Sequence, residues 1–290
     1  MLEISGRTRF TAIFGDPVAH SLSPAMHNAA YAALGLERAY LAFHVAPEHL
    51  HDALRALPAL EIAGVNLTVP HKEQAIAMMA EVSEEARMLG AINCVANRTD
   101  GLYGDNTDAR GLELDLRESG VIAGGRTAVI IGAGGAAAAA VVACARMGVE
   151  KIVLCNRTIE RAASLAQRFT SSSRTPAGIP IEAGGLDRLA DAAIMADTVL
   201  VINATPMGLK TGSFSPLAYD AMPADCMFYD MVYAREPTPF MAPALALGRR
   251  ALDGAGMLLH QGTLAFELFN NVAAPVAVMR AALMAALGRS

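Results

Sequence analysis

The sequence predicts an α/β fold on three observations. Short apolar stretches typical of strands alternate with helical patterns along most of the chain, which favours mostly parallel sheets with helices on their faces. A glycine-rich segment near residue 132 joins an apolar stretch to an alanine-rich helix, so the alternation starts again in the second half. The length of 290 residues suits one large domain or two medium ones. We therefore expect two domains.

The first domain is expected over residues 1–108. Its predicted strands are 10–15, 39–45 and 62–69, with further strands near 91–97 and 102–104. Its predicted helices are 23–35, 47–57 and one that starts near Pro70. In the helix 23–35, Ser23 is a natural N-cap, Pro24 fits the first turn and Gly35 ends it. These elements predict an α/β domain with a mostly parallel sheet.

The second domain is expected over residues 109–255. Residues 126–158 predict a strand, a glycine turn, a helix and a second strand, and further strands follow at 198–206 and 226–233. Residues 170–178 have the composition of a surface loop. The chain then ends in two apolar helices, 256–269 and 274–287, with no strand between them.

The composition argues against several classes of function. A net charge of −5, a pI near 5.8 and the lack of a Lys/Arg run give no reason to expect a nucleic-acid or membrane partner. Residues 127–145 are uncharged, but a glycine cluster divides them as a strand-to-helix turn would. The four cysteines are far apart and lack metal-site spacing, which predicts reduced thiols, a cytoplasmic location and no metal. The first residues lack the apolar region of a signal peptide.

The glycine turn predicts a dinucleotide site. Gly132, Gly134 and Ala137 match the pattern G-x-G-x-x-[GA] between a strand and a helix, which is the phosphate-binding turn of a Rossmann domain. The next strand ends in Asn156-Arg157-Thr158, and Arg161 follows one turn later. A carboxylate at that strand end would hold the free ribose hydroxyls of NAD, whereas arginine with small polar donors suits the 2′-phosphate of NADP. The sequence therefore favours NADP.

A set of polar residues follows the predicted strands of the first domain. In open α/β sheets, ligands gather at the carboxyl ends of the strands, and these residues fall there: Ser21, Ser23, Asn66, Thr68, Lys72, Asn93 and Asp108. Each one also has a local explanation as a cap, a turn residue or a solvated lysine. Taken singly, they do not establish a site.

Taken together and in order, the motifs of this chain resemble those of the shikimate dehydrogenases. They are HSLSPAMHNAAYAALG, GVNLTVPHK, GAIN, GDNTD, GAGGAA, NRT, INATPMG, DMVY and DGAGMLLHQ. The resemblance spans nearly the whole chain. It implies an NADP-dependent oxidoreductase that reversibly reduces 3-dehydroshikimate to shikimate, in the biosynthesis of chorismate and the aromatic amino acids. It also implies that residues 256–290 return to the first domain and complete it.

The resemblance assigns roles to individual residues. Lys72 and Asp108 would be the catalytic pair, with the lysine stabilising the charge that grows on the substrate oxygen and donating the proton. The substrate would be bound by hydroxyls and amides, which donate and accept hydrogen bonds. The hydroxyls of Ser21, Ser23 and Tyr233 would bind the carboxylate, and Asn66, Thr68, Asn93 and Gln261 would bind the ring hydroxyls.

The resemblance also gives the cofactor contacts. The pyrophosphate would lie on Gly132, Ala133, Gly134, Gly135 and Ala136, and the 2′-phosphate on Asn156, Arg157 and Thr158. The nicotinamide side would contact Thr205, Pro206, Met207, Gly256 and Met257.

Two departures from the family pattern leave the substrate open. Ala109 and Arg110 follow NTD where the family usually has glycine, and AREPTPF follows Tyr233 in a region that varies. A quinate or quinate/shikimate dehydrogenase, or a paralogue acting on a related cyclic carboxylate, is therefore an alternative. A non-catalytic ligand sensor is disfavoured because Lys72 and Asp108 are both present. The sequence does not decide between a monomer and a homodimer.

Overall fold

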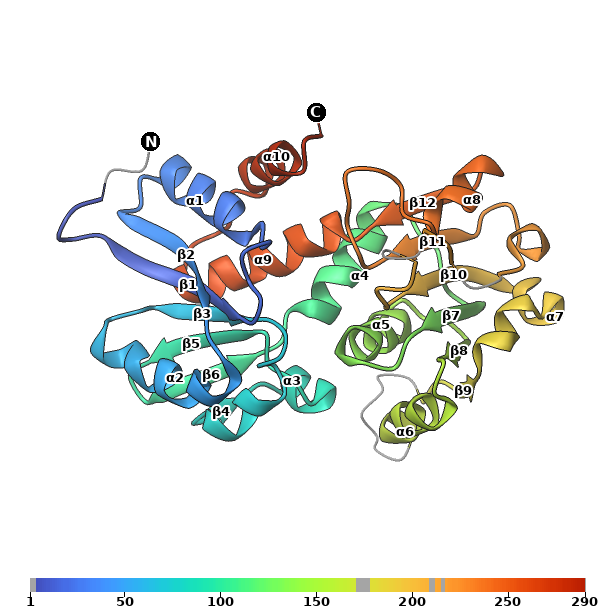
Figure 1. The fold of residues 1–290 in the computed structure, drawn as a ribbon, viewed down its shortest axis with the longest axis horizontal. Helices are drawn as coiled ribbons and strands as arrows, with labels where there is room; N and C mark the ends of the chain where they lie inside the picture. The colour runs from blue at the N-terminus through green and yellow to red at the C-terminus, as the bar shows by residue number, and fades with distance from the viewer. Residues whose placement is uncertain (1–3, 171–177, 209–211, 215–216, 290) are drawn as a thin grey trace. The chain divides into compact units, whose positions relative to one another are not determined.

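The computed structural model describes residues 4–170, 178–208, 212–214 and 217–289, and Figure 1 shows their secondary structure. The chain forms two compact units. The first unit contains residues 1–111 and 258–290, and the second contains residues 112–257. The chain therefore leaves the first unit within helix α4 (Asp108–Glu118) and returns to it within helix α9 (Ala255–Asn270).

A six-stranded sheet forms the centre of the first unit, in the order β2-β1-β3-β5-β6-β4. Its strands are β1 (Arg9–Gly15), β2 (Arg38–His44), β3 (Gly64–Leu67), β4 (Glu81–Val82), β5 (Cys94–Arg98) and β6 (Gly101–Asp105). β1 pairs in parallel with β2 and β3, as the sequence predicts. β5 runs antiparallel to β3 and β6. Two residues join β5 to β6, and so short a connection can only form a hairpin.

The helices of the first unit are α1 (Ser23–Leu34), α2 (Leu50–Ala59), α3 (Glu84–Leu89) and α10 (Val276–Ala286), with part of α4 and most of α9. Gly35 ends α1 in the left-handed conformation, with φ of 62°. The predicted N-cap at Ser23 is wrong, because Leu22 is the cap and Ser23 is already helical. The predicted helix near Pro70 is also wrong. Pro70 follows a cis peptide bond, and only a short 3-10 turn forms, at Gln74–Met78.

The C-terminal helices pack on the first unit, and α10 lies beside α1 (Figure 1). The ring of Phe269 in α9 lies directly over Gly64 in β3. A Cβ on Gly64 would lie 2.2 Å from that ring and 2.7 Å from the carbonyl oxygen of Val95. Only glycine therefore lets α9 approach the sheet this closely.

Gly64→Ala is expected to lower the free energy of unfolding by about 1–3 kcal/mol, because the methyl group overpacks a rigid contact. Urea unfolding measured by circular dichroism would test this. Gly124→Ala is the matched control, because the nearest atom to its added Cβ is 3.8 Å away. An equal effect of the two substitutions would contradict the packing argument.

The second unit contains a fully parallel sheet in the order β12-β11-β10-β7-β8-β9. Its strands are β7 (Thr127–Ile131), β8 (Lys151–Cys155), β9 (Ile181–Gly184), β10 (Thr198–Asn203), β11 (Met227–Asp230) and β12 (Arg250–Asp253). Its other helices are α5 (Gly135–Arg146), α6 (Ile159–Thr170), α7 (Ala192–Met195) and α8 (Met241–Ala246). The strand order reverses between β7 and β10, which is the topology of the Rossmann fold.

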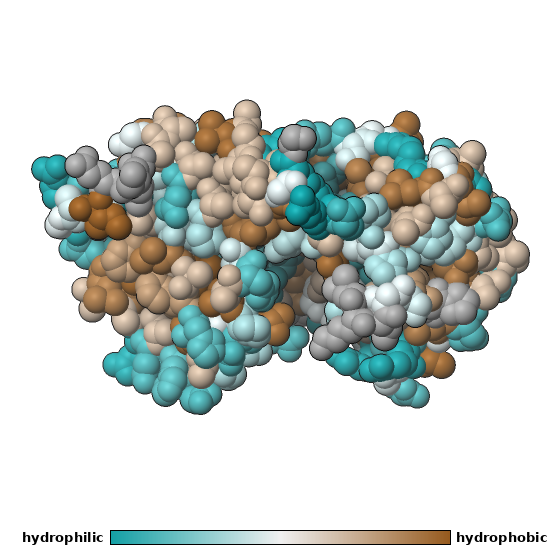
Figure 2. Space-filling model, turned by 45° about the horizontal axis from the view of Figure 1, so that its top comes forward, coloured by the Kyte–Doolittle hydropathy of each residue, from teal (hydrophilic) through white to brown (hydrophobic). Residues whose placement is uncertain are grey.

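The surface of each unit is mixed. Figure 2 shows hydrophilic and hydrophobic patches interspersed over the visible face. In the described part of the chain, no helix has the length and apolar character to cross a membrane. All four cysteines are buried free thiols. Most of the predicted surface loop, residues 171–177, lies outside the described residues.

Candidate active site

Lys72 and Asp108 form an ion pair in the first unit. Lys72 follows β3 and Asp108 begins α4, and Nζ of the lysine donates to Oδ2 of the aspartate at 2.6 Å. Both side chains are partly shielded, with 29% of Lys72 and 11% of Asp108 exposed. The Lys72 side chain is therefore partly open to a ligand, and the carboxylate fixes the orientation of its ammonium group.

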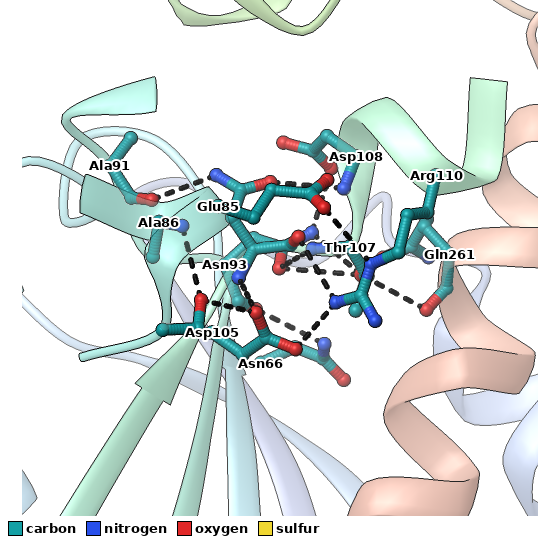
Figure 3. A network of polar contacts seen from close by, with 12 residues as sticks. Asn66, Glu85, Ala86, Ala91, Asn93, Asp105, Thr107, Asp108, Arg110 and Gln261 are labelled. Atoms are coloured by element: carbon teal, nitrogen blue, oxygen red, sulfur yellow. Dashed lines mark hydrogen bonds and ion pairs between the residues drawn. The ribbon is translucent and has the colours of Figure 1, made fainter. Parts of the chain in front are cut away.

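Asn93 connects Asp108 to the rest of the polar set (Figure 3). Its Nδ2 donates to Oδ1 of Asp108 at 2.7 Å and to Oγ1 of Thr107 at 3.0 Å. The backbone N–H of Thr107 donates back to Oδ1 of Asn93 at 2.9 Å. Both oxygens of the Asp108 carboxylate are thus held by donors, one from Lys72 and one from Asn93. Such a network pre-organises the carboxylate before any ligand arrives.

Asn66 extends the network along the sheet. The residue is buried in β3, and its Nδ2 donates to the backbone oxygen of Asn93 at 3.1 Å. Thr68 comes directly after β3 and is half-buried. The structure therefore brings Asn66, Asn93, Lys72 and Asp108 together.

Ser21 and Ser23 lie together at the start of α1. The backbone N–H of Ser23 donates to Oγ of Ser21 at 3.3 Å, and the Ser23 side chain is buried. Two hydroxyls at a helix N-terminus suit an anionic group.

Gln261 reaches the network through its backbone. Its carbonyl oxygen accepts from Oγ1 of Thr107 at 3.1 Å, whereas its own Nε2 donates to the carbonyl of Leu258 at 2.8 Å. Helix α4 approaches α9 here because Gly111 has no side chain, and a Cβ at that position would lie 2.8 Å from the backbone nitrogen of Gln261. Gln261 thus lies beside Thr107, but its side chain hydrogen-bonds its own helix.

Arg110 stabilises the turn that precedes Asp108, and it is one of the departures from the family pattern. Its guanidinium contacts Asp105 at 2.5 Å and Glu85 at 3.4 Å (Figure 3). Burial lowers the pKa of Arg110, but the two carboxylates outweigh burial and raise it overall. The arginine therefore remains charged, and its ion pairs hold α3, β6 and α4 together beside Asp108.

The glycine turn of the second unit lies where the strand order reverses. Gly132 follows β7 with φ of 125°, and a Cβ there would lie 3.1 Å from the carbonyl oxygen of Ala204. Gly134 caps α5, and a Cβ on Gly134 or Gly135 would meet open space. A phosphate group can therefore approach the backbone N–H groups of this turn and of Ala136.

A cavity of about 290 Å³ follows the ends of β7, β8 and β10. It is lined by Ile131, Asn156, Arg157, Thr158, Arg161, Leu186, Thr205, Pro206 and Met207. The structure thus brings the predicted 2′-phosphate ligands next to the predicted nicotinamide ligands Thr205, Pro206 and Met207. Arg161 and Ala133 also line a neighbouring cavity of about 340 Å³. A turn open to phosphate beside two cationic side chains fits a phosphorylated dinucleotide.

The start of α9 is held by a buried hydroxyl. Tyr229 donates to Oδ2 of Asp115 at 2.6 Å and accepts from the backbone N–H of Met257. Burial first, and then the neighbouring carboxylate, raises the pKa of Tyr229 well above its usual value. A Cβ on Gly256 would lie 2.0 Å from the Asp115 carboxylate, so a larger residue there would displace the carboxylate that accepts from Tyr229.

Tyr233 belongs to the second unit, whereas the other predicted substrate ligands belong to the first. It is half-buried, and burial raises the pKa of its phenol. Its role in carboxylate binding stays a prediction.

Three family models match the chain. They are the shikimate dehydrogenase substrate binding domain over residues 13–95, shikimate / quinate 5-dehydrogenase over residues 118–206, and the shikimate 5′-dehydrogenase C-terminal domain over residues 254–284. The shikimate dehydrogenase (NADP(+)) of Moorella thermoacetica is 42% identical, covering 100% of this chain and 97% of that protein. The chain belongs to the shikimate dehydrogenase family.

Solved structures agree with this family assignment. Shikimate 5-dehydrogenase from Thermus thermophilus, in complex with NADP(H) and shikimate, superposes with a TM-score of 0.83 at 37% identity, covering 96% of this chain and all of that one. Quinate dehydrogenase from Corynebacterium glutamicum, in complex with NAD, has a TM-score of 0.86 at 29% identity, covering 96% and 99%. The two-domain α/β fold with a Rossmann unit is thereby confirmed.

The sequence motifs did not single out every residue of this hydrogen-bond network. Thr107 and Asn106 lie inside the GDNTD motif, which could have suggested them. Asn106 accepts the backbone N–H of Asp108 at 2.9 Å and so fixes the first turn of α4. The hydroxyl of Tyr40 donates to Oδ1 of Asn66 at 2.7 Å. The sequence did not indicate this contact, because Tyr40 is one of several apolar residues in a predicted strand.

Proposed function

We propose that the protein is an NADP-dependent shikimate dehydrogenase that reversibly reduces 3-dehydroshikimate to shikimate, in the biosynthesis of aromatic amino acids. The observation that supports this most directly is the Lys72–Asp108 pair, which lies at the centre of buried amides and hydroxyls. A polyol with one reacting oxygen requires neutral donors and acceptors around a single proton donor. Similarity to shikimate dehydrogenases over the full chain supports the same substrate.

In the proposed mechanism, NADPH supplies the hydride when it is bound. Lys72 lies beside the oxygen that gains charge, stabilises that charge as an ammonium and gives up its proton. Asp108 orients the ammonium, and Asn93 holds the other oxygen of the carboxylate. In the reverse direction the same pair must accept the proton of the hydroxyl. Asn66, Thr68, Asn93 and Gln261 would bind the ring hydroxyls, and Ser21, Ser23 and Tyr233 the carboxylate.

NADP is the proposed cofactor because the second unit offers the groups that it requires. Gly132, Ala133, Gly134, Gly135 and Ala136 provide an open turn at the start of α5, suited to the pyrophosphate. Asn156, Arg157, Thr158 and Arg161 provide donors for a 2′-phosphate. Gly256 and Met257 would approach the nicotinamide, together with Thr205, Pro206 and Met207.

A cytoplasmic location and a monomeric or homodimeric state are also proposed. Four buried cysteines without a disulfide agree with a reducing compartment. Separation by size with light scattering would give the oligomeric state.

Turnover of shikimate and quinate, each with NADP and NAD, tests the proposed function. We expect shikimate with NADP to give the highest kcat/KM of the four pairs, because the whole set of predicted ring ligands is present. Quinate dehydrogenase activity is the second candidate, since a quinate dehydrogenase shares the fold at 29% identity. A higher kcat/KM for quinate would establish this alternative, and no turnover of either acid would contradict both.

A further inference from the structure

Tyr40 is a buried tyrosine that connects two groups of the candidate site. Its hydroxyl donates to Oδ1 of Asn66 at 2.7 Å and accepts a hydrogen bond from Ser23. Only 1% of the residue is exposed, so Tyr40 lies behind the residues that face a ligand. Register places Tyr40 opposite Thr11 and Asn66 opposite Ile13. The tyrosine therefore reaches across β1 on one face of the sheet.

Contacts to both its backbone and its ring hold Tyr40 in place. The side-chain amide of Asn28 in α1 accepts the backbone N–H of Tyr40 at 2.7 Å and donates to its carbonyl at 3.0 Å. The ring of His27 stacks on the tyrosine ring, with centroids 4.1 Å apart and planes inclined by 23°. Burial lowers the pKa of His27 to about 3, so that ring is neutral near neutral pH. These contacts fix the position of the Tyr40 hydroxyl.

The Tyr40 hydroxyl and the Asn93 carbonyl together hold the Asn66 amide in one orientation. The carbonyl of Asn93 can only accept a hydrogen bond, so Nδ2 of Asn66 faces it at 3.1 Å, and the Tyr40 hydroxyl donates to the remaining atom, Oδ1, at 2.7 Å. Within the described residues, the second hydrogen of Nδ2 has no partner. Burial raises the pKa of Tyr40 well above its usual value, so the phenol remains a donor across the working pH range. Asn66 can therefore offer a ligand an N–H but not a free carbonyl oxygen.

We propose that Tyr40 is a positioning residue that orients Asn66, so that Asn66 donates to an oxygen of the substrate. This inference rests on the proposed function, because it takes the ligand of Asn66 to be a ring hydroxyl of shikimate. Without the Tyr40 hydroxyl, Oδ1 of Asn66 loses its donor, and only the hydrogen bond to the Asn93 carbonyl still holds the amide in place.

Tyr40→Phe is the test, because it removes one oxygen and keeps the ring that stacks on His27. We expect the KM for shikimate to rise about three- to tenfold, which corresponds to one neutral hydrogen bond. The kcat and the KM for NADP should change by less than about twofold, because the variant weakens substrate binding equally in the ground state and in the transition state.

Tyr31→Phe is the matched control. Tyr31 is also fully buried in the first unit, and its hydroxyl bonds Oγ1 of Thr11 at 2.6 Å, away from the predicted substrate ligands. It should lose comparable stability and keep the wild-type KM for shikimate. Equal KM values in the two variants would overturn the proposal, while wild-type activity on shikimate would still support the proposed function.

A double-mutant cycle with Asn66→Ala separates positioning from general loosening of the site. If Tyr40 acts through Asn66, then Tyr40→Phe should raise the KM by less than about 1.5-fold once Asn66 is absent. Full additivity of the two effects would also overturn the proposal. A wild-type protein that fails to oxidise shikimate would refute the proposed function and this inference together.

Discussion

Lys72→Ala is expected to lower kcat for shikimate oxidation by about 10²–10⁴-fold, the usual contribution of a positioned acid or base. The ammonium lies 2.6 Å from Asp108, and the other carboxylate oxygen stays bound to Asn93 when the lysine is removed. The remaining amides and hydroxyls can still hold the substrate, so the KM should change little. Steady-state kinetics with saturating NADP would measure both parameters.

Lys151→Ala is the control for this variant. Lys151 also pairs with an acid, Glu182 at 3.6 Å, but lies on β8 of the second unit. It should keep wild-type kcat. A large rise in KM at unchanged kcat in Lys72→Ala would show that Lys72 binds rather than catalyses.

Arg157→Ala is expected to abolish most of the preference for NADP over NAD. In the wild type we expect NADP to exceed NAD in kcat/KM by about 10- to 100-fold, which corresponds to one charge-assisted contact of roughly 1.5–3 kcal/mol. Arg157 lines the cavity at the end of β8 with Asn156 and Thr158, and none of these three side chains is a carboxylate. The variant should lose activity with NADP and barely change with NAD.

Arg126→Ala is the control for the cofactor experiment. Arg126 lies in the same unit and pairs with Asp225 at 2.6 Å, apart from the residues that line the cavity. It should leave the ratio of kcat/KM values unchanged. A wild-type protein that uses NAD as well as NADP would contradict the interpretation of Asn156-Arg157-Thr158 and would favour the quinate alternative.

The sequence determined the features that depend on neighbouring residues. The glycine turn at Gly132 needs a positive φ and a close approach to Ala204, and only glycine meets both requirements. Gly35 ends α1 for the same conformational reason. Alternating strands and helices predicted both sheets, because a parallel sheet requires a crossover after each strand. The sequence motifs predicted Lys72, Asp108 and Asn93 as site residues, because these three residues lie next to predicted strand ends.

Only the tertiary structure decided which of these residues touch. Local pattern predicted a helix after Pro70, but the chain there turns and forms a 3-10 segment before β4. Tyr40 and Asn66 are 26 residues apart, and they meet because β1 lies between their strands in a given register. Arg110 in α4 pairs with Asp105 in β6 and with Glu85 in α3. Contacts of this kind depend on strand order and burial. A hydrogen bond between side chains on different strands produces no periodic pattern in the sequence from which it could be predicted.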